Sequence, residues 1–424
     1  MSGVTRPLGW SSKRLKYLAT YNDEVLAENT DKDQEIDYVE ISGVSLSRGI
    51  EQVERMTFGQ VPSRARRKVR SGDVLISTVR TYLRAIATVN EASSDLIAST
   101  GFCVVRPNDE VDSGFIGWAA RSEPFVSEVV ARSVGVSYPA INASELVTIE
   151  IPLPPLETQR RIARFLDEKT ARIDGLIEKK RALLDRLAEK RQALITRAVT
   201  KGLNPDAPMK PSGIDWLGDI PSHWNLLRLK FIVSEPLSYG VNAAAEFDEP
   251  EWPRFVRITD VDELGRLRDE TFRSLPPDVA DGYLLQPNDI LLARSGATVG
   301  KSFIYKISWG VACYAGYLIR ARIKKEHDAR FFYWFLNSIL YWDWVGSNFI
   351  QSTIQNISAD RYANLQIPHP PNKDEQQQIV DVIESSCAQI DSQWEAITRS
   401  VGRLNEFRAA LITAAVTGQI AELR

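Results

Sequence analysis

The segments EKRQALITRAVT (Glu189–Thr200) and NEFRAALITAAVT (Asn405–Thr417) are two copies of one stretch of sequence. The match extends upstream, where Ile162 and Ile379 are 217 residues apart, and the same spacing holds throughout both copies. A repeat of that length in a chain of 424 residues indicates two halves of one structural plan.

Apolar residues recur in both copies at alternating intervals of three and four, from about residue 157 to 200 and from about residue 374 to 417. That spacing forms the a/d seam of a coiled coil. At about 1.5 Å per residue, each helix would be roughly 60 Å long. We therefore predict two long helices that pack on each other. The predicted seam consists of apolar residues from both copies: Ile162, Leu166, Ile173, Ile177, Leu184, Leu187, Leu194, Ile379, Ile383, Ile390, Trp394, Ile397, Val401, Leu404 and Leu411.

Composition places the chain among ordinary globular proteins of two to four domains, with 44% hydrophobic and 25% charged residues. The net charge of −3 lacks the basic excess of many nucleic-acid-binding proteins, so any DNA-binding site must rest on local patches. Three cysteines without metal-ligand spacing suggest a reducing compartment, which we expect to be the cytoplasm. No targeting segment or membrane span is apparent.

The most apolar stretch, FFYWFLNSILYWDW (Phe331–Trp344), is too short for a membrane span and is interrupted by polar residues. We interpret it as a buried aromatic helix. A docking face for a partner protein is the alternative, because aromatic residues also concentrate at interfaces.

The remaining sequence also repeats. Strands are predicted at Asp37–Val44, from Val74 and at Phe102–Val105, and a helix at Phe115–Arg132 that breaks near Pro124. The strand VEISGVS returns as VRITDVD (256–262), and SGDVLIS returns as PNDILLA (287–293). The predicted organisation is a mixed α/β domain at 1–155, a long helix at 156–200, a linker at 201–223, a second α/β domain at 224–371, and a second long helix at 372–424.

The segment SGATVGKS (Ser295–Ser302) resembles a phosphate-binding loop but lacks the first glycine of that pattern. We interpret it as a loop at the end of a strand, which offers backbone amides and polar side chains to an acidic surface such as DNA. An enzyme that uses Lys301 as a phosphate ligand is the alternative. The three histidines are scattered and have no metal-ligand spacing to a cysteine, so neither a metal site nor a catalytic residue is predicted.

Both halves place basic and hydroxyl residues around equivalent strands, and both have a polar loop before the extended exit that leads to the long helix. Arginine reads guanine edges, and Ser, Thr, Asn and Gln contact bases or phosphates. A solvated charged face is the alternative for any one of these residues. The predicted DNA contacts are Arg64, Arg66, Arg67, Lys68, Arg80, Tyr82, Arg84, Ser137, Tyr138, Arg294, Ser295, Thr298, Lys301, Gln351, Ser352, Thr353 and Gln355.

Four stretches carry a resemblance to a known family. They are IPLPPLETQRRIARFL (Ile151–Leu166), its repeat IPHPPNKDEQQQIVDVI (Ile367–Ile383), the ALIT segments at Ala193 and Ala410, and SGIDWLGDIPSHW (Ser212–Trp224). With them the chain resembles, over nearly its whole length, the specificity subunit of type I restriction–modification enzymes.

The resemblance implies two α/β target-recognition domains in tandem, separated by two helices that form an antiparallel coiled coil, with an internal pseudo-two-fold repeat. It implies a non-catalytic subunit that recognises a bipartite site in double-stranded DNA. The implied partners are two methyltransferase subunits and restriction/translocase subunits. S-adenosylmethionine, ATP and magnesium would bind to those partners, and no cofactor is expected in this chain. A stand-alone DNA-binding or regulatory protein of the same fold is the alternative.

An antiparallel arrangement also predicts which seam residues face each other. If the two copies overlap fully, Arg191 falls beside Cys387, and Arg408 falls beside Thr170. Each seam arginine would then meet a small, weakly polar partner. Such paired polar positions fix the register of a coiled coil at some cost in stability.

Overall fold

The computed structural model describes residues 9–262, 265–347 and 356–424, and the chain divides into two compact units. Unit 1 consists of Met1–Arg181 and Thr398–Arg424, and unit 2 consists of Ala182–Ile397. Each unit contains one α/β domain together with one end of each long helix. We call residues 9–155 the first domain and residues 202–372 the second domain.

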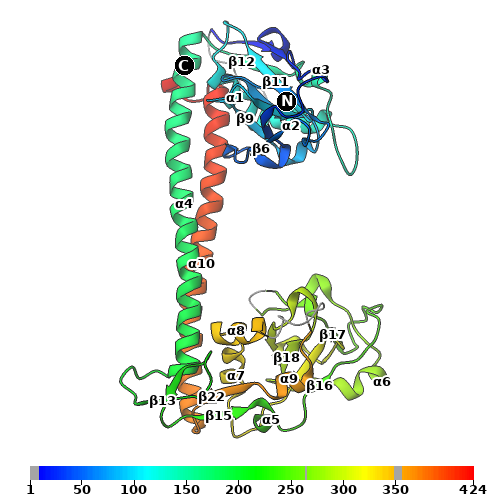
Figure 1. Ribbon diagram of the computed structural model, residues 1–424, viewed down its shortest axis with the longest axis vertical. Helices are drawn as coiled ribbons and strands as arrows, with labels where there is room; N and C mark the ends of the chain where they lie inside the picture. The colour runs from blue at the N-terminus through cyan, green and yellow to red at the C-terminus, as the bar shows by residue number, and fades with distance from the viewer. Residues whose placement is uncertain (1–8, 263–264, 348–355) are drawn as a thin grey trace. The chain divides into compact units, whose positions relative to one another are not determined.

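The two predicted long helices are α4 (Leu156–Lys201) and α10 (Lys373–Val416), which pack together (Figure 1). Ion pairs within each unit show that they run antiparallel. In unit 1, Nε of Arg408 lies 3.0 Å from the Asp174 carboxylate. In unit 2, Nε of Arg191 lies 3.6 Å from the Asp391 carboxylate. The two pairs occupy equivalent positions of the repeat, so the internal symmetry extends to the charged seam positions.

These pairs correct the predicted surroundings of the seam arginines. Thr170 and Arg408 do line one cavity, and Arg191 lies near enough to lower the pKa of the Cys387 thiol, although burial raises that pKa more strongly. The ion-pair partner of each guanidinium is nevertheless an aspartate. A charge withdrawn from water needs a compensating opposite charge, which a small, weakly polar residue does not supply.

The ends of the predicted seam are the best buried. Ile162 and Leu166 belong to the core of the first domain, and Ile379 and Ile383 belong to the core of the second, so these residues are covered by a domain as well as by the partner helix. Away from the domains the burial is weaker, and Trp394 is 39% exposed. Trp394 is thus the most exposed of the predicted seam residues. The other predicted seam residues are buried or half-buried.

The first domain contains two four-stranded sheets. The first has the order β6-β3-β10-β7, with β6 (Glu54–Thr57), β3 (Glu35–Val39), β10 (Leu96–Ser99) and β7 (Ala65–Lys68). The second has the order β2-β11-β8-β9, with β2 (Ala19–Tyr21), β11 (Phe102–Pro107), β8 (Val74–Ser77) and β9 (Ile86–Thr88). Strand β3 is shorter than the predicted strand because a 3-10 turn at Ile41–Gly43 separates it from β4 (Val44–Ser45), which pairs with β5 (Gly49–Ile50).

The second domain repeats much of this topology. Its four-stranded sheet has the order β16-β21-β18-β19, which matches β2-β11-β8-β9 position by position. The strands are β16 (Ser238–Tyr239), β21 (Leu318–Ala321), β18 (Ile290–Ala293) and β19 (Ser302–Ile304). A parallel pair, β17 (Arg254–Val256) with β20 (Ala312–Tyr314), corresponds to the parallel pair of β3 with β10. The predicted strand at 256–262 is wrong, because a 3-10 turn begins at Ile258.

A two-stranded antiparallel ribbon leads from each domain into its long helix. In unit 1, β1 (Ser11–Arg14) pairs with β12 (Glu150–Leu153), which precedes α4. In unit 2, β15 (Asn225–Arg228) pairs with β22 (Gln366–His369), which precedes α10. The prolines after each exit strand remove backbone donors and end the pairing there. The linker contains a small ribbon of its own, β13 (Met209–Pro211) with β14 (Asp219–Pro221).

Helices cover these sheets. In the first domain, α1 (Ser113–Arg121) and α2 (Glu123–Arg132) are separated at Ser122, as the break near Pro124 predicted. The aromatic stretch forms two helices rather than one, α7 (Ala329–Phe335) and α8 (Ile339–Ser347), because the Ser338 hydroxyl accepts a hydrogen bond from the Tyr341 amide and starts a new helix. The remaining short helices are α3 (Ala143–Leu146), α5 (Leu229–Ile232), α6 (Pro277–Ala280) and α9 (Ala359–Ala363).

The aromatic stretch is largely core, as predicted. Phe331, Phe332, Phe335 and Tyr341 are fully buried in the second domain, and Trp342 remains 40% exposed. Their burial favours the core interpretation over a docking face. Among the described residues, no helix is both long enough and apolar enough to cross a membrane.

Candidate nucleic-acid interface

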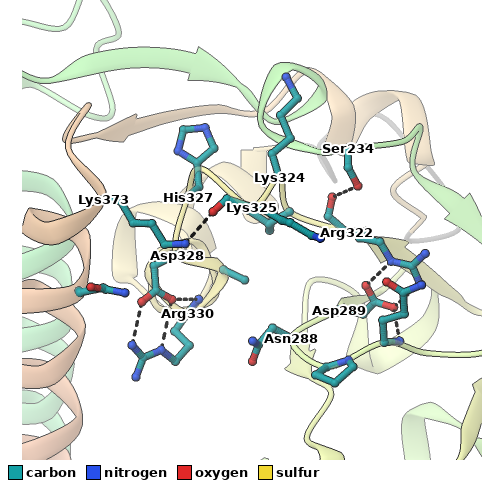
Figure 2. Close-up of a pocket in the computed structure, with 15 residues that line it drawn as sticks. Ser234, Asn288, Asp289, Arg322, Lys324, Lys325, His327, Asp328, Arg330 and Lys373 are labelled. Carbon is teal, nitrogen blue, oxygen red and sulfur yellow. Dashed lines mark hydrogen bonds and ion pairs between the residues drawn. The ribbon is translucent and has the colours of Figure 1, made fainter.

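A buried aspartate fixes the start of the strand that leads to the predicted surface in each domain. Asp289, just before β18, accepts hydrogen bonds from Nε and Nη2 of Arg322, both at 2.8 Å (Figure 2). Asp73, just before β8, accepts the equivalent bonds from Arg106 at 2.9 and 2.8 Å. These bonds raise the pKa of both guanidinium groups. Bidentate pairs of this kind restrict geometry as well as adding energy, so they hold the strand starts in place.

A buried glutamine in the first turn of each long helix joins the helix to its domain. In α10, the Gln376 side chain accepts a hydrogen bond from the Asp328 amide at 2.8 Å and donates one to the Pro370 carbonyl at 2.9 Å. In α4, Gln159 makes the same two bonds: it accepts from the Asp112 amide at 2.9 Å and donates to the Pro154 carbonyl at 2.8 Å. We call the Asp–Arg pair and this glutamine together the polar joint. It occurs once in each half.

A cavity lies beside each polar joint. The one in the second domain measures about 650 Å³ and is lined by Lys324, Lys325, Lys373 and His327 (Figure 2). Its counterpart in the first domain measures about 350 Å³ and has Asn108, Asp109 and Leu156 among its lining residues. The two halves therefore share the polar joint, while the charge of the surface next to it has diverged.

Beyond the polar joint, the strand end leads into the predicted contact surface. In the first domain the loop at 78–84 follows β8, and we call it the strand-end loop. The Ile141 amide donates to the Thr78 carbonyl at 2.8 Å, and Val79 bridges to Ala140. The strand-end loop is thereby fastened to residues 134–140, which we call the exit loop. The structure thus brings together two segments that were predicted separately.

The second domain repeats this junction. The Ile357 amide donates to the Arg294 carbonyl at 2.8 Å, and Ser295 bridges to Asn356. Gln351, Ser352, Thr353 and Gln355, which were predicted to contact DNA from the segment before this junction, lie outside the described residues.

The strand-end loop of the first domain exposes several predicted contacts. Arg80 and Arg84 have φ angles of 50° and 52°, in the left-handed region that residues other than glycine seldom adopt. Arg80 lies over the Tyr138 ring, 5.0 Å from its centroid, and both Tyr82 and Tyr138 are more than half exposed. Arg84 instead forms a bidentate ion pair with Glu123 at 2.9 and 3.0 Å, so its charge is already balanced.

The predicted cluster at 64–68 lies on β7, at the edge of its sheet, with Arg64 directly before that strand. The Thr100 amide donates to the Arg64 carbonyl at 2.7 Å, and the Thr78 amide donates to the Gly101 carbonyl at 2.8 Å. One tight turn therefore connects Arg64 to the strand-end loop. Arg64 is also ion-paired with Glu40.

The rest of the cluster is less available for binding. Arg66 lies over the Phe58 ring at 4.9 Å, and both Arg66 and Arg67 are half-buried. Lys68 and Ser137 are exposed. Of the cluster, Arg64 and Lys68 thus present the most accessible cations.

In the second domain, Arg294 lies over the Tyr239 ring at 4.7 Å, and its amide is bonded to the Tyr317 carbonyl at 3.0 Å. Tyr317 is 65% exposed and Tyr239 is 41% exposed. Neither tyrosine was predicted from the sequence. The only sequence signal for Tyr317 was its place beside the glycine turn at Gly316, which separates two buried strands.

The structure corrects the expectation that the segment at 295–302 offers its backbone amides to an acidic surface. It forms a 3-10 turn at Gly296–Thr298 and then enters strand β19, whereas a phosphate-binding loop leads into a helix. The amides of Val299, Gly300 and Lys301 donate to protein carbonyls at 3.0–3.1 Å, so they are not available to bind a phosphate. The side chains of Ser295, Thr298 and Lys301 are half-buried. Among the described residues, no group of three or more His, Cys, Asp or Glu could hold a metal ion.

Comparison with known proteins identifies the family. The family model described as the type I restriction modification DNA specificity domain matches residues 7–186 and 265–397. The chain belongs to this family. Among curated members, it is 26% identical to the EcoKI specificity subunit of Escherichia coli strain K12 over 75% of this chain and 68% of that protein. It is 24% identical to the EcoBI specificity subunit of Escherichia coli over 70% of this chain and 64% of that protein.

Solved structures show that the fold of this specificity-family chain is shared. A chain solved in work on complex assembly and conformational transition of the type I R-M system superposes with a TM-score of 0.78 at 22% identity, covering 99% of this chain and all of that one. The HsdS subunit from Thermoanaerobacter tengcongensis superposes with a TM-score of 0.53 at 23% identity, covering 99% of both chains. The specificity-subunit resemblance and the predicted fold class are thereby confirmed.

Proposed function

We propose that each domain of this type I specificity chain reads one half of a bipartite site in double-stranded DNA through its strand-end loop. The observation that supports this most directly is the shared junction. Both domains fasten the end of a buried strand to the segment before the exit strand, and both place an arginine over an exposed tyrosine there. The scaffold repeats while the exposed side chains differ, as expected for two readers with different targets.

The candidate arginine contacts differ in whether a carboxylate already balances their charge. Among the described residues, Arg80 and Arg294 form no ion pair, whereas Arg64 and Arg84 are held by Glu40 and Glu123. An arginine without a carboxylate partner can donate to a guanine edge or a phosphate without first breaking an ion pair. Arg80 and Arg294 are therefore the leading candidates for base contacts in the first and second half-sites.

The test uses the full chain in complex with its methyltransferase partners. The recognised site is first read from methylated positions in the host genome. Arg80→Ala and Arg294→Ala are each expected to relax discrimination in one half-site only, by about 1–3 kcal/mol if the contact is bidentate. Equal weakening on all sequences would identify a phosphate contact instead. Arg55→Ala is the matched control, because Arg55 lies on β6, at the sheet edge opposite β7.

The partner part of the proposal rests on a second duplicated feature. Tyr17 and Phe231 are 60% and 55% exposed, and in each case the preceding lysine, Lys16 or Lys230, lies over the ring. Both sites lie at the start of a domain, directly after the first strand of the exit ribbon. An exposed aromatic side chain that recurs in otherwise diverged halves suits two copies of one partner, and we assign these positions to two methyltransferase subunits.

The other expected partners and cofactors follow from membership of a type I complex. Restriction/translocase subunits would join the assembly in the cytoplasm. S-adenosylmethionine, ATP and magnesium would bind to the partner subunits. A stand-alone DNA-binding regulator is the competing function. Gel-shift titration of the isolated chain beside the complex separates the two. Tight, site-specific binding by the isolated chain would favour the regulator.

A further inference from the structure

The exit loop of the first domain is a closed turn. The Val134 amide donates to the Ala140 carbonyl at 2.9 Å, and the Ala140 amide donates back at 3.0 Å. Gly135 has a φ angle of 117°, and a Cβ atom there would lie 3.1 Å from the Tyr138 carbonyl oxygen. Glycine is required by this backbone, and the turn has a defined shape before it meets any ligand.

This turn presents apolar side chains to solvent. Val136 is fully exposed at 102%, Val134 is 80% exposed and Tyr138 is 65% exposed. The neighbouring strand-end loop adds Tyr82 and Leu83, which are 54% and 47% exposed. Single exposed apolar residues are ordinary, but a cluster on two loops bonded to each other marks an interaction site.

The cation beside the cluster indicates which ligand it fits. Arg80 lies over the Tyr138 ring at 5.0 Å and has no ion-pair partner within the described part of the chain. A guanidinium next to apolar groups matches a DNA groove, where acceptors and phosphates surround one kind of apolar group, the C5-methyl of thymine. Wedges that separate stacked bases use longer side chains such as Phe, Leu, Ile or Met, whereas valine is short and branched.

We propose that Val136 is a specificity-determining residue that contacts the methyl group of a thymine in the half-site read by the first domain. The proposal rests on the proposed function and adds a statement about the target, because that half-site must then contain a thymine whose methyl group faces the major groove. The equivalent segment of the second domain lies outside the described residues, so the assignment concerns the first domain alone.

The test replaces thymine by deoxyuridine, which removes only the methyl group. Duplexes that carry the mapped site are made with each thymine of both half-sites exchanged in turn, and binding is measured with the full chain in its methyltransferase complex. One exchange is expected to weaken binding of the wild-type complex by about fourfold, the effect of one buried methyl group. With Val136→Ser the same exchange should have no effect. Exchanges at thymines of the other half-site should affect Val136→Ser and wild type equally, which provides the internal control.

Val136→Thr is the conservative variant, because it keeps the branched shape and one methyl group, and it should retain part of the discrimination. The side chain is fully exposed, so neither variant should disturb folding, and melting of the complex checks this. Three outcomes overturn the assignment: no half-site thymine responds to the exchange, the response is equal in Val136→Ser and wild type, or Val136→Ser weakens subunit assembly and not DNA discrimination. If the complex binds no site selectively, the proposed function itself fails.

Discussion

Asp289 and Asp73 are each 1% exposed, and each is balanced by one arginine. Removing one member of such a pair leaves an uncompensated charge out of water. Asp289→Ala is expected to lower the free energy of unfolding by about 2–3 kcal/mol. The loss is smaller than in a fully buried, isolated pair because Arg322 keeps some contact with water and also pairs with Glu235 at 2.8 Å. Urea unfolding of the full chain measures this.

The matched control is Glu168→Ala. Glu168 and its ion-pair partner Arg172 are both exposed, so removal of the Glu168 carboxylate should leave the unfolding midpoint unchanged. If Asp289→Ala and Glu168→Ala unfold at the same urea concentration, the polar joint contributes nothing to stability.

His369 makes the second domain sensitive to acid. Burial and the neighbouring His327 lower the pKa of His369 to about 4. Between about pH 6.5 and pH 4, the unfolded chain therefore takes up a proton that the folded chain does not. Stability from this residue is present above pH 6.5 and falls as the pH decreases, by up to about 1.4 kcal/mol per pH unit.

His369→Leu tests this prediction, because the equivalent position of the first exit ribbon is Leu153. Urea unfolding at pH 7, 6 and 5 should show a smaller loss of stability for the variant than for the wild type. Identical pH profiles for the two proteins would show that His369 does not cause the acid sensitivity.

The sequence predicted individual residues unevenly. Aligning SGDVLIS with PNDILLA placed Asp73 and Asp289 at equivalent positions, but it did not connect them to Arg106 and Arg322. Those arginines lie at the ends of apolar strands at the same spacing in both halves, which was the available signal. The exposure of Val136 was not predictable, because an apolar residue in a loop is buried or exposed according to long-range packing.

At the scale of elements, the long helices were the most predictable part of the chain. Their starts lie within one residue of the expected positions, because the heptad spacing and the preceding prolines are both local signals. The second helix ends at Val416, before the predicted bound at residue 424. The strands at 37–44 and 256–262 were overestimated. In each, a 3-10 turn interrupts an apolar alternation that alone resembles a single strand.

The helix pair gives a cross-linking prediction. Nε of Arg191 in α4 lies 3.6 Å from the Asp391 carboxylate, and Asp391 is one helical turn after Cys387 on α10. Arg191→Cys is expected to form a disulfide with Cys387 when a mild oxidant is added, detected by mass spectrometry without reduction. Lys190→Cys is the control, because that neighbouring side chain is exposed. Cross-linking of the control in preference to Arg191→Cys would contradict the observed register.

At the scale of the whole molecule, the repeat predicts how many methyltransferase subunits bind to one chain. If Tyr17 and Phe231 each receive one methyltransferase subunit, Tyr17→Ser and Phe231→Ser should each leave a complex with one such subunit, and the double variant should retain none. Native mass spectrometry counts the bound copies. Ile307→Ser is the control, because Ile307 is 77% exposed and its counterpart in the first domain is Glu91. If the double variant still binds two subunits, the methyltransferase subunits dock at another surface.

The division of the chain into units has a consequence for protein synthesis. Unit 2 is one continuous segment, whereas unit 1 joins Met1–Arg181 to Thr398–Arg424. The core of unit 1 includes Ile412, Ala415 and Val416, which the ribosome adds only after the whole of unit 2. Part of the apolar core of the first domain therefore stays uncovered until these residues are synthesised, whereas unit 2 can already fold. The usual order of domain folding on the ribosome is reversed, and the unfinished first domain is the part most in need of a chaperone.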